Sequence, residues 1–449
     1  MPESFDLVAI GSGTAATTVA QRCRAAGWRV AVIEEREFGG TCALRGCEPK
    51  KTLWTLAETA DRARRLAGKG LAGGDRVSID WQALMTFKRS FTDPVPEKRS
   101  RTLAEAGIEA IQGTARFIGA NTVEAAGRRL EARHILIATG AAPARLPIDG
   151  SELLATSDDF LSLERLPRRL VMLGGGYISF ECAHIAVRAG AEVTILHADD
   201  QPLGHFDQDL VQRLVAHSRH VGITVELGCK AVAVERGPDG GMVVTAEDGR
   251  RFEGEIALHG LGRTPQLDAL DLPAGGVATE KGRLKLDRHL RSTTNPAVFA
   301  AGDAAAMGPP LTPVASHDAD VVARNLLEGC HHEPDYTGVS SVVFTIPPLA
   351  SVGLSEEAAR RDGVAFELRQ GDMAEYQSVR RTGEPAAAFK LLLQPQTGCI
   401  LGAHLLGPQA EEVINLFALA VRLHLPAAQL KRLLSAYPSG GSNVAGMLG

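Results

Sequence analysis

The segment FDLVAIGSGTAA, residues 5–16, decides the fold of this chain. Its apolar run predicts a strand over Phe5–Ile10, its glycines predict a tight turn, and the periodic pattern that follows predicts a helix to Ala26. A second predicted strand, Arg29–Ile33, ends on Glu34, 21 residues after Gly13. Strand, turn, helix and strand in this order, with an acid at this spacing, are typical of a dinucleotide-binding unit.

Each small residue of the turn has a physical role in such a unit. Gly11 permits the tight turn, Gly13 lets the backbone approach a pyrophosphate, and Ala16 lets the helix pack close to the strand. The helix N-terminus offers free amides and the positive end of its dipole to the phosphates. Glu34 is the candidate acceptor for hydrogen bonds from an adenosine ribose. The alternative is a turn that is only structural.

A second copy of the pattern predicts a second dinucleotide. The strand Leu170–Leu173 leads into GGGYIS, residues 174–179, then a helix to Ala189 and a strand over Glu192–Leu196. The candidate residues of this second site are Gly174, Gly176, Ser179, which occupies the third glycine position, and His197, which follows the second strand.

Composition restricts the class of partner. The 449 residues are enough for roughly three or four domains, and a formal net charge of -5 gives no broad basic surface, so no nucleic-acid partner is expected. No apolar run reaches the roughly 18 to 20 residues that span a bilayer, and the chain enters a strand directly without a charged leader, so we expect no membrane association and a cytoplasmic protein.

The predicted fold class is α/β, with two Rossmann-like dinucleotide-binding domains and a C-terminal α+β domain. The last 115 residues carry strands at Val342–Thr345, Ala388–Leu393 and Ile400–Leu406 and helices at Glu411–Leu423 and Ala427–Leu434. A strand–turn signal at 297–303 and a helix over Pro313–Leu327 indicate a return to the first domain. The predicted boundaries are 1–147, 148–265, 266–335 and 336–449.

Two of the seven cysteines stand close together, in GGTCALRGCEPKK, residues 39–51. Cys42 and Cys47 are five positions apart, a rise of about 7.5 Å on an ideal helix, whereas the Cα atoms of a disulfide lie about 4.4 to 6.8 Å apart. A bridge therefore needs a local distortion, for which Gly46 and Pro49 are suited, and a strained bridge is easily reduced. The alternatives are a zinc pair, for which further ligands are not evident, and two plain thiols.

At this point the chain resembles the flavoprotein disulfide reductases, the family of glutathione reductase, dihydrolipoamide dehydrogenase and mercuric reductase. The resemblance implies an FAD-dependent enzyme that takes electrons from NADH or NADPH, and a homodimer whose C-terminal domain completes the partner's disulfide pocket. It rests on motifs in the family's order along the chain: the turn at Gly11, the cysteine pair, Ala138-Thr139-Gly140, the turn at Gly174, GLGRTP at 260–265, Ala301-Gly302-Asp303 and VGLSE at 352–356.

The resemblance assigns roles to residues around the cysteine pair. Cys42 corresponds to the cysteine that exchanges with substrate, and Cys47 to the one that lies against the flavin and forms a charge-transfer complex with it. Lys51 and Glu181 correspond to a pair beside the flavin near the nicotinamide; the alternative is that they are ordinary surface charges. A helix N-terminus and Lys51 are expected to lower a cysteine pKa.

Further positions follow from the same motifs. Asp303 corresponds to the acid that binds the ribityl chain of FAD, and Leu311–Ala315 to the segment whose helix N-terminus faces the pyrimidine end of the flavin. The remaining candidates are Gly40, Thr41, Gly140 and Ala315 for FAD, and Gly262 for NAD(P). No resident metal is predicted.

The chain departs from the family near its C-terminus. Where the family has a His-Pro and a Glu four residues after the Pro, this chain has Tyr437-Pro438 and Ser442. An unperturbed tyrosine is a poor base at neutral pH. His317 and His424 are possible substitutes, although a lone helical histidine is more often structural. Mercuric reductase also has a tyrosine in this region, but its C-terminal cysteine pair is missing here.

The nicotinamide and the acceptor stay open at this level. Asp199 and Asp200, just after the second strand of the second unit, repel a 2'-phosphate and favour NADH. Three functions are compatible with the residues: a reductase of a disulfide substrate, an electron transferase acting on a metal ion, quinone or protein, and a redox-sensing flavoprotein. Tyr437 is expected to act across the dimer interface.

Overall fold

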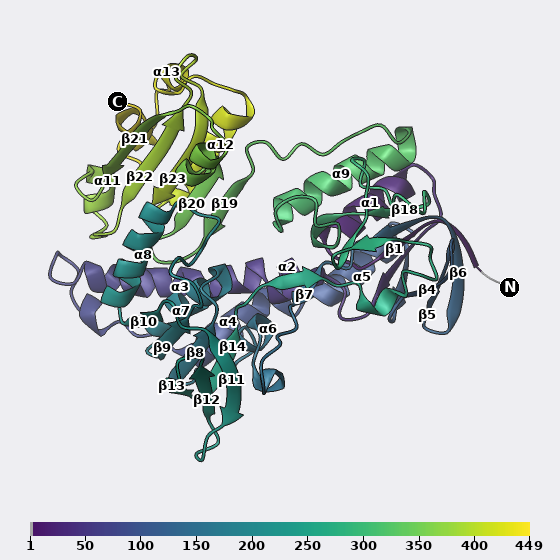
Figure 1. The fold of residues 1–449 in the computed structure, drawn as a ribbon, viewed down its shortest axis with the longest axis horizontal. Helices are drawn as coiled ribbons and strands as arrows, with labels where there is room; N and C mark the ends of the chain where they lie inside the picture. Colours follow the sequence, from purple (N-terminus) through teal and green to yellow (C-terminus); the bar gives the residue numbers. More distant parts are fainter. Residues whose placement is uncertain (1–2) are drawn as a thin grey trace. The chain divides into compact units, whose positions relative to one another are not determined.

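The computed structural model describes residues 3–449, which form two compact units, each built from three stretches of chain (Figure 1). Of the described residues, the first unit contains 3–50, Lys88–Ala144 and Arg263–Tyr336. The second unit contains Lys51–Phe87, Arg145–Gly262 and Thr337–Gly449. The two glycine-rich turns therefore belong to different units.

A mostly parallel sheet forms the centre of the first unit. In spatial order its strands are β3 (Glu109–Gln112), β2 (Val30–Glu34), β1 (Glu3–Ile10), β6 (Arg128–Ile137), β5 (Thr122–Ala125) and β4 (Arg116–Gly119), with β18 (Val298–Ala300) paired to β6. β1 pairs in parallel with β2 and β6, and α1 (Thr14–Ala25) connects β1 to β2. The predicted strand–turn–helix–strand unit is confirmed.

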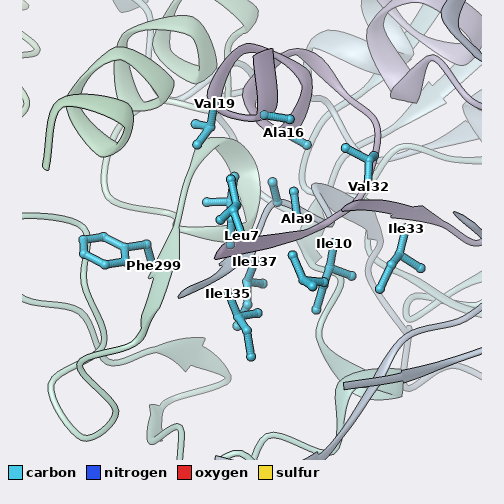
Figure 2. Close-up of a cluster of buried hydrophobic side chains, with 14 of the residues drawn as sticks. Leu7, Ala9, Ile10, Ala16, Val19, Val32, Ile33, Ile135, Ile137 and Phe299 are labelled. Atoms are coloured by element: carbon cyan, nitrogen blue, oxygen red, sulfur yellow. The ribbon is translucent and has the colours of Figure 1, made fainter. Parts of the chain in front are cut away.

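The core of the first unit packs between β1 and α1 (Figure 2). Ala16 and Val19 of α1 lie over Leu7 and Ala9 of β1, and all four are fully buried. Because β1 is covered on both faces, its sequence is a continuous apolar run rather than an alternating one. The single methyl group of Ala16 leaves the helix free to approach the strand closely.

A four-stranded parallel sheet forms one part of the second unit. Its order is β10 (Ile223–Glu226), β9 (Glu192–Leu196), β8 (Arg169–Leu173) and β14 (Ile256–His259). α7 (Tyr177–Arg188) follows β8, and α8 (Gln208–His220) follows β9. An antiparallel sheet of β11 (Ala231–Arg236), β12 (Met242–Ala246) and β13 (Arg251–Gly254) lies between β10 and β14 in the sequence. The second predicted dinucleotide-type unit is thus also confirmed.

The C-terminal part of the second unit is an antiparallel sheet with a helix. The strand order is β19 (Ser340–Val343), β20 (Leu349–Gly353), β23 (Ile400–Leu406), β22 (Ala388–Leu393) and β21 (Glu367–Asp372). α12 (Ala410–Arg422) packs on it through Val413, Ile414 and Phe417. The predicted α+β character is confirmed, with exact bounds for β22 and β23. β21 was not predicted, because its sequence ELRQGD lacks the apolar alternation of a half-buried strand.

The remaining elements complete the chain. They are α2 (Gly40–Arg45), α3 (Cys47–Arg65), α4 (Trp81–Thr92), α5 (Val95–Glu105), α6 (Ser157–Phe160), α9 (Thr312–Glu328), α10 (Glu356–Arg361), α11 (Gln377–Arg380), α13 (Ala427–Leu430), α14 (Val444–Met447), β7 (Ala141–Pro143), β15 (Arg263–Pro265), β16 (Thr279–Glu280), β17 (Arg283–Leu284) and short 3-10 turns, of which η4 (Gly302–Ala304) matters below. The helix predicted over 427–434 ends at Leu430. Among residues 3–449, no helix combines the length and apolar character that crossing a membrane requires.

A buried polar network joins the two parts of the second unit. Arg188, which is 3% exposed, pairs with Asp61 at 3.0 Å and donates to the Ile346 carbonyl at 3.1 Å. The same carbonyl lies 3.1 Å from His217 Nε2. Burial lowers the pKa of His217 to about 4, and the positive charge of Arg188 acts in the same direction. His217 is therefore neutral in the folded protein at neutral pH.

His217 makes folding stability depend on pH. Its pKa is lower in the folded chain than the ordinary 6.5, so its stabilising contribution is present above about pH 6.5 and is lost as the pH falls towards 4. The loss amounts to about 3 kcal/mol at most. We expect His217→Gln to flatten the decrease of the urea midpoint between pH 6.5 and 4, whereas His220→Gln, at the exposed neighbour, keeps the wild-type slope. Equal slopes in all three proteins would contradict this assignment.

Candidate functional site

The turn after β1 requires glycine and leaves room for a ligand. Gly11 has φ +106°, and a Cβ there would lie 2.3 Å from the Ala138 carbonyl oxygen, so only glycine fits. A Cβ at Gly13 would meet nothing within 4 Å. Gly13 is also the N-cap of α1, and no side chain caps the helix there. The first turn of α1 thus has no side-chain cap and has room beside Gly13, which suits a bound phosphate group.

Glu34 is held by the backbone of the same turn. Its Oε2 accepts from the amide and the hydroxyl of Ser12 at 3.0 and 2.6 Å, and its Oε1 accepts from the Arg36 amide at 2.9 Å. The Ser12 hydroxyl oxygen in turn accepts from the Gly39 amide at 2.9 Å. Glu34 therefore orders the turn and the entrance to α2, beside any role towards a ribose. Ser12 was not predicted, although its place inside the glycine motif is the available signal.

A third wall of this site comes from late in the sequence. Gly302 lies between α1 and α9, since a Cβ there would be 3.5 Å from the Ala15 methyl and 3.2 Å from the Ala315 methyl. Asp303 follows it, and burial raises the pKa of its carboxyl, against the charge of Arg263. The Thr139 hydroxyl is buried without a hydrogen-bond partner within residues 3–449.

The predicted FAD residues of the first unit are therefore brought together. Uncapped amides on α1, the half-buried and partly desolvated carboxyl of Asp303, and an unsatisfied hydroxyl are groups that an elongated polar cofactor such as FAD would satisfy. Gly140 lies just after β6, next to Thr139. It has φ +70° and open space at its Cβ position. The residues present fit FAD.

The cysteine pair spans a helix break at Gly46. α2 ends at Arg45, Gly46 adopts φ -142° and ψ -113°, and α3 begins with Cys47. A Cβ on Gly46 would be 2.9 Å from the Thr41 carbonyl oxygen. Pro49 stands in the first turn of α3, where its missing amide removes no helical hydrogen bond. The distortion expected from the sequence is confirmed, and both cysteines are in the dithiol form.

Thr312, the first residue of α9, contacts both sulfurs. Its hydroxyl donates to Cys42 Sγ at 3.1 Å and lies 3.6 Å from Cys47 Sγ. Hydrogen bonding with Cys47, then burial, raise the pKa of the Cys42 thiol, whereas the Thr312 hydroxyl lowers it. The pKa of Cys42 in the dithiol is thus raised, whereas the sequence led us to expect a lowered cysteine pKa. The reason is that two adjacent thiols lose their second proton with difficulty.

The second glycine turn shows a compensation for Ser179. A Cβ on Gly174, at φ +99°, would be 2.7 Å from the Gly260 carbonyl, and a Cβ on Gly260 would be 2.1 Å from Ser179 Oγ. Glycine at position 260 therefore makes room for a serine where the motif has glycine. Gly176 is the N-cap of α7, and no side chain caps the helix there. Gly262, at φ +102°, has open space at its Cβ position. These features fit a second dinucleotide.

His197 stands where many such units carry the ribose-binding acid. Its Nδ1 accepts from the Gly175 amide at 3.0 Å, and its Nε2 lies 3.1 Å from the Gln201 carbonyl. Both ring nitrogens are therefore engaged with the backbone. His197 therefore ties the end of β9 to the glycine turn.

Lys51 and Glu181 form the predicted pair in the second unit. Lys51 Nζ lies 3.6 Å from Glu181 Oε1 and 3.1 Å from the centre of the Phe344 ring. Glu181 is 2% exposed and accepts from the Phe344 amide at 2.7 Å. A buried acid fixed in this way is no ordinary surface charge. Phe344 was not predicted, since nothing in the sequence near it indicates a site.

Tyr437 and the two alternative bases have different surroundings. Tyr437 is 83% exposed. His317 Nε2 accepts from the Asp335 amide at 2.9 Å, so this histidine has a structural partner. His424 is exposed just beyond α12. The structure thus gives His317 no catalytic setting.

The sulfur contacts of Thr312 lead to a prediction. Thr312→Val removes the hydroxyl that lowers the pKa of Cys42, so the pKa rises further and alkylation of the dithiol by iodoacetamide at fixed pH slows by about three- to tenfold. Thr312→Ser is expected to restore the rate. Ser316→Ala, which removes a hydroxyl bonded to the Thr312 carbonyl, is the matched control. An unchanged rate in Thr312→Val would show that the contacts have no electrostatic effect.

Comparison with known proteins gives related chains over the full length. A glutathione reductase of Burkholderia cepacia is 33% identical over 97% of this chain and 96% of its own length. A mercuric reductase of Lysinibacillus sphaericus is 32% identical over 97% of this chain and 80% of its own. Among solved structures, the HOCl-induced flavoprotein disulfide reductase RclA of Escherichia coli matches with a TM-score of 0.89 at 28% identity, over 99% of each chain.

Family models agree with these relatives. The model described as pyridine nucleotide-disulphide oxidoreductase matches residues 5–319, and the model for the dimerisation domain of that family matches residues 339–447. The two turns, the cysteine pair and the C-terminal sheet all fall within these ranges. The chain belongs to the pyridine nucleotide-disulphide oxidoreductase family and is an FAD-dependent oxidoreductase that acts on NAD(P)H.

Proposed function

We propose that Cys42 and Cys47 form the redox centre of this enzyme and that the dithiol reduces a disulfide substrate. The observation that supports this most directly is the Thr312 hydroxyl, which contacts both sulfurs at the start of α9. When bound, FAD supplies the two-electron connection between NAD(P)H and the cysteine pair. We assign FAD binding to residues 1–147 and 266–335, NAD(P) binding to residues 148–265, and the dimer interface to residues 336–449.

The chemistry at the sulfurs balances without a further reactant. Cys42 attacks one sulfur of the substrate disulfide, and the other substrate sulfur leaves as a thiol. Cys47 then attacks Cys42, which releases the second substrate thiol and forms the Cys42–Cys47 disulfide. Thr312 donates to the Cys42 sulfur and stabilises negative charge there. Lys51 contacts Glu181 and Phe344, and we propose that it positions the nicotinamide ring of NAD(P)H.

The exit of the substrate thiol differs from that of glutathione-type enzymes. Tyr437 replaces the histidine base, and Ser442 donates to the Ser439 carbonyl at 2.7 Å in place of a glutamate. A neutral phenol donates a hydrogen bond but removes a proton poorly at neutral pH. Substrates whose leaving thiol has a low pKa are therefore favoured, because such a thiol leaves without protonation.

A soft metal ion is the second candidate acceptor. Mercuric reductases are among the relatives, and a Cu(II) complex of RclA is among the similar structures. Cys42 and Cys47 both contact the Thr312 hydroxyl, and two adjacent cysteines are suitable ligands for a soft ion. If Cu(II) is the acceptor, two Cu(II) ions each take one electron from the dithiol and become Cu(I). The dithiol becomes the disulfide and releases two protons.

Cysteine variants separate these acceptors. In anaerobic assays that follow NADH oxidation, we expect Cys42→Ser to lower turnover of an aromatic disulfide by at least about a hundredfold, because the attacking sulfur is missing. Reduction of menadione should persist, since it needs no cysteine. Cys399→Ser, a half-buried thiol in the second unit, is the control. Disulfide turnover that survives in Cys42→Ser would overturn the proposal, and turnover of Cu(II) alone by the native enzyme would favour the metal candidate.

We further propose that NADH is the preferred donor. Both ring nitrogens of His197 are engaged with the backbone, and the exposed Asp199 and Asp200 follow β9, so their negative charges disfavour a 2'-phosphate. We expect kcat/KM for NADH to exceed that for NADPH by about tenfold or more, and the Asp199→Asn, Asp200→Asn double variant to narrow the ratio. Glu192→Gln, at the opposite end of β9, is the control. An equal ratio in the double variant and the native enzyme would contradict this.

We also propose a homodimer and a cytoplasmic location. The dimerisation-domain match over 339–447 and the exposed Leu419, Leu423 and Leu434 support the dimer. Tyr437 is then supplied to the partner's disulfide pocket. A dithiol that must be re-reduced at each turnover needs the reduced nicotinamide and reducing conditions of the cytoplasm.

A further inference from the structure

The loop Gly302–Leu311 connects two proposed functional residues. It begins at η4, which contains Asp303, and ends immediately before Thr312. The loop forms no strand or α-helix, and Ala306 within it adopts φ +52°. Its backbone hydrogen bonds are short-range, such as Ala305 to Gly302 at 2.9 Å. Something outside the loop must therefore fix its shape.

Asp318 of α9 holds the start of this loop. Its side chain is 1% exposed, although α9 otherwise buries mainly apolar residues. Its Oδ2 accepts from the Gly302 amide at 3.0 Å, and its Oδ1 accepts from the Tyr336 hydroxyl at 2.8 Å. A buried carboxylate is costly unless it is hydrogen-bonded, and here each oxygen has a partner.

Tyr336 covers the middle of the same loop. A Cβ built on Gly308 would lie 2.7 Å from the Tyr336 ring, so the ring packs directly on the Gly308 backbone. The segment that carries Tyr336 is also fixed to α9, because the Asp335 amide donates to His317 Nε2 at 2.9 Å. The His317 and Tyr336 rings meet edge to face, with centroids 6.0 Å apart. The loop is thus gripped at Gly302 and at Gly308 from one side.

We propose that Asp318 and Tyr336 are positioning residues that hold Asp303 for FAD and Thr312 for the two sulfurs. The inference rests on the roles proposed for Asp303 and Thr312. Asp318 and Thr312 belong to one helix, so a loop tied to Asp318 keeps a fixed offset from the hydroxyl that contacts Cys42. Release of the loop frees Asp303 to move relative to α9, and FAD then has to order it on binding.

We call the contacts of Asp318 with Gly302 and of Tyr336 with Asp318 and Gly308 the clamp. Two conservative variants of the full-length protein test it. Tyr336→Phe removes the hydroxyl and keeps the ring on Gly308, and Asp318→Asn weakens both hydrogen bonds. We expect each to raise the dissociation constant of FAD for the apoprotein by roughly tenfold and to change the alkylation rate of the reduced cysteine pair. Asn325→Ala is the matched control. Asn325 lies on the same helix, is 4% exposed, and bonds to His289 and His332 rather than to the loop.

The outcomes separate the clamp from the proposed function. Asp303→Asn and Thr312→Val test directly the roles on which the clamp depends. Weaker FAD binding in Asp303→Asn, with native FAD affinity and alkylation in Tyr336→Phe and Asp318→Asn, would overturn the clamp alone. Unchanged FAD binding in Asp303→Asn would overturn its role and the clamp together. If Asn325→Ala weakens FAD as much as Tyr336→Phe does, the effect is general destabilisation and the inference is wrong.

Discussion

The contact between Gly13 and Gly40 is the constraint on which the site of the first unit depends. A Cβ on Gly40 would lie 2.5 Å from the Gly13 Cα, so the start of α2 rests on the turn that begins α1. Cys42 follows two residues later. The same contact that forms the nucleotide turn therefore also fixes the cysteine pair, and a side chain at Gly40 would separate the two segments. Ser12 reinforces the contact, because it bonds both Glu34 and Gly39.

Around this contact the first unit collects groups that are costly to bury alone. Asp303 and Asp318 are both desolvated, and burial raises the pKa of each carboxyl. Asp318 is satisfied by protein groups, whereas Asp303 has no comparable set of protein donors within residues 3–449. The two acids have therefore different tasks: one holds the fold, and the other is available to a ligand. Two carboxyl groups in different environments commonly have different roles.

The departure from the family near the C-terminus leaves the local structure around the cysteine pair intact. The helix break at Gly46, the sulfur contacts of Thr312 and the buried Glu181 beside Lys51 are all present. Two positions depart from the family pattern: Tyr437, which is exposed, stands in the histidine position, and Ser442 stands in the glutamate position. Relatives named as reductases of glutathione and of mercury share this scaffold, which fits the general rule that one fold carries different activities.

By itself, the sequence determined the two glycine turns, the α/β class and the cysteine pair, because each is encoded in contiguous residues whose spacing has a direct local meaning. The tertiary structure alone decided that Ser179 faces Gly260, that Thr312 meets Cys42, and that Tyr336 bonds Asp318. An acid at a core-facing position of α9, in step with Val314 and Val321, was the one available signal for the last of these. Contacts between residues up to 270 positions apart depend on how the sheet brings separated segments together, and local patterns carry no information about that.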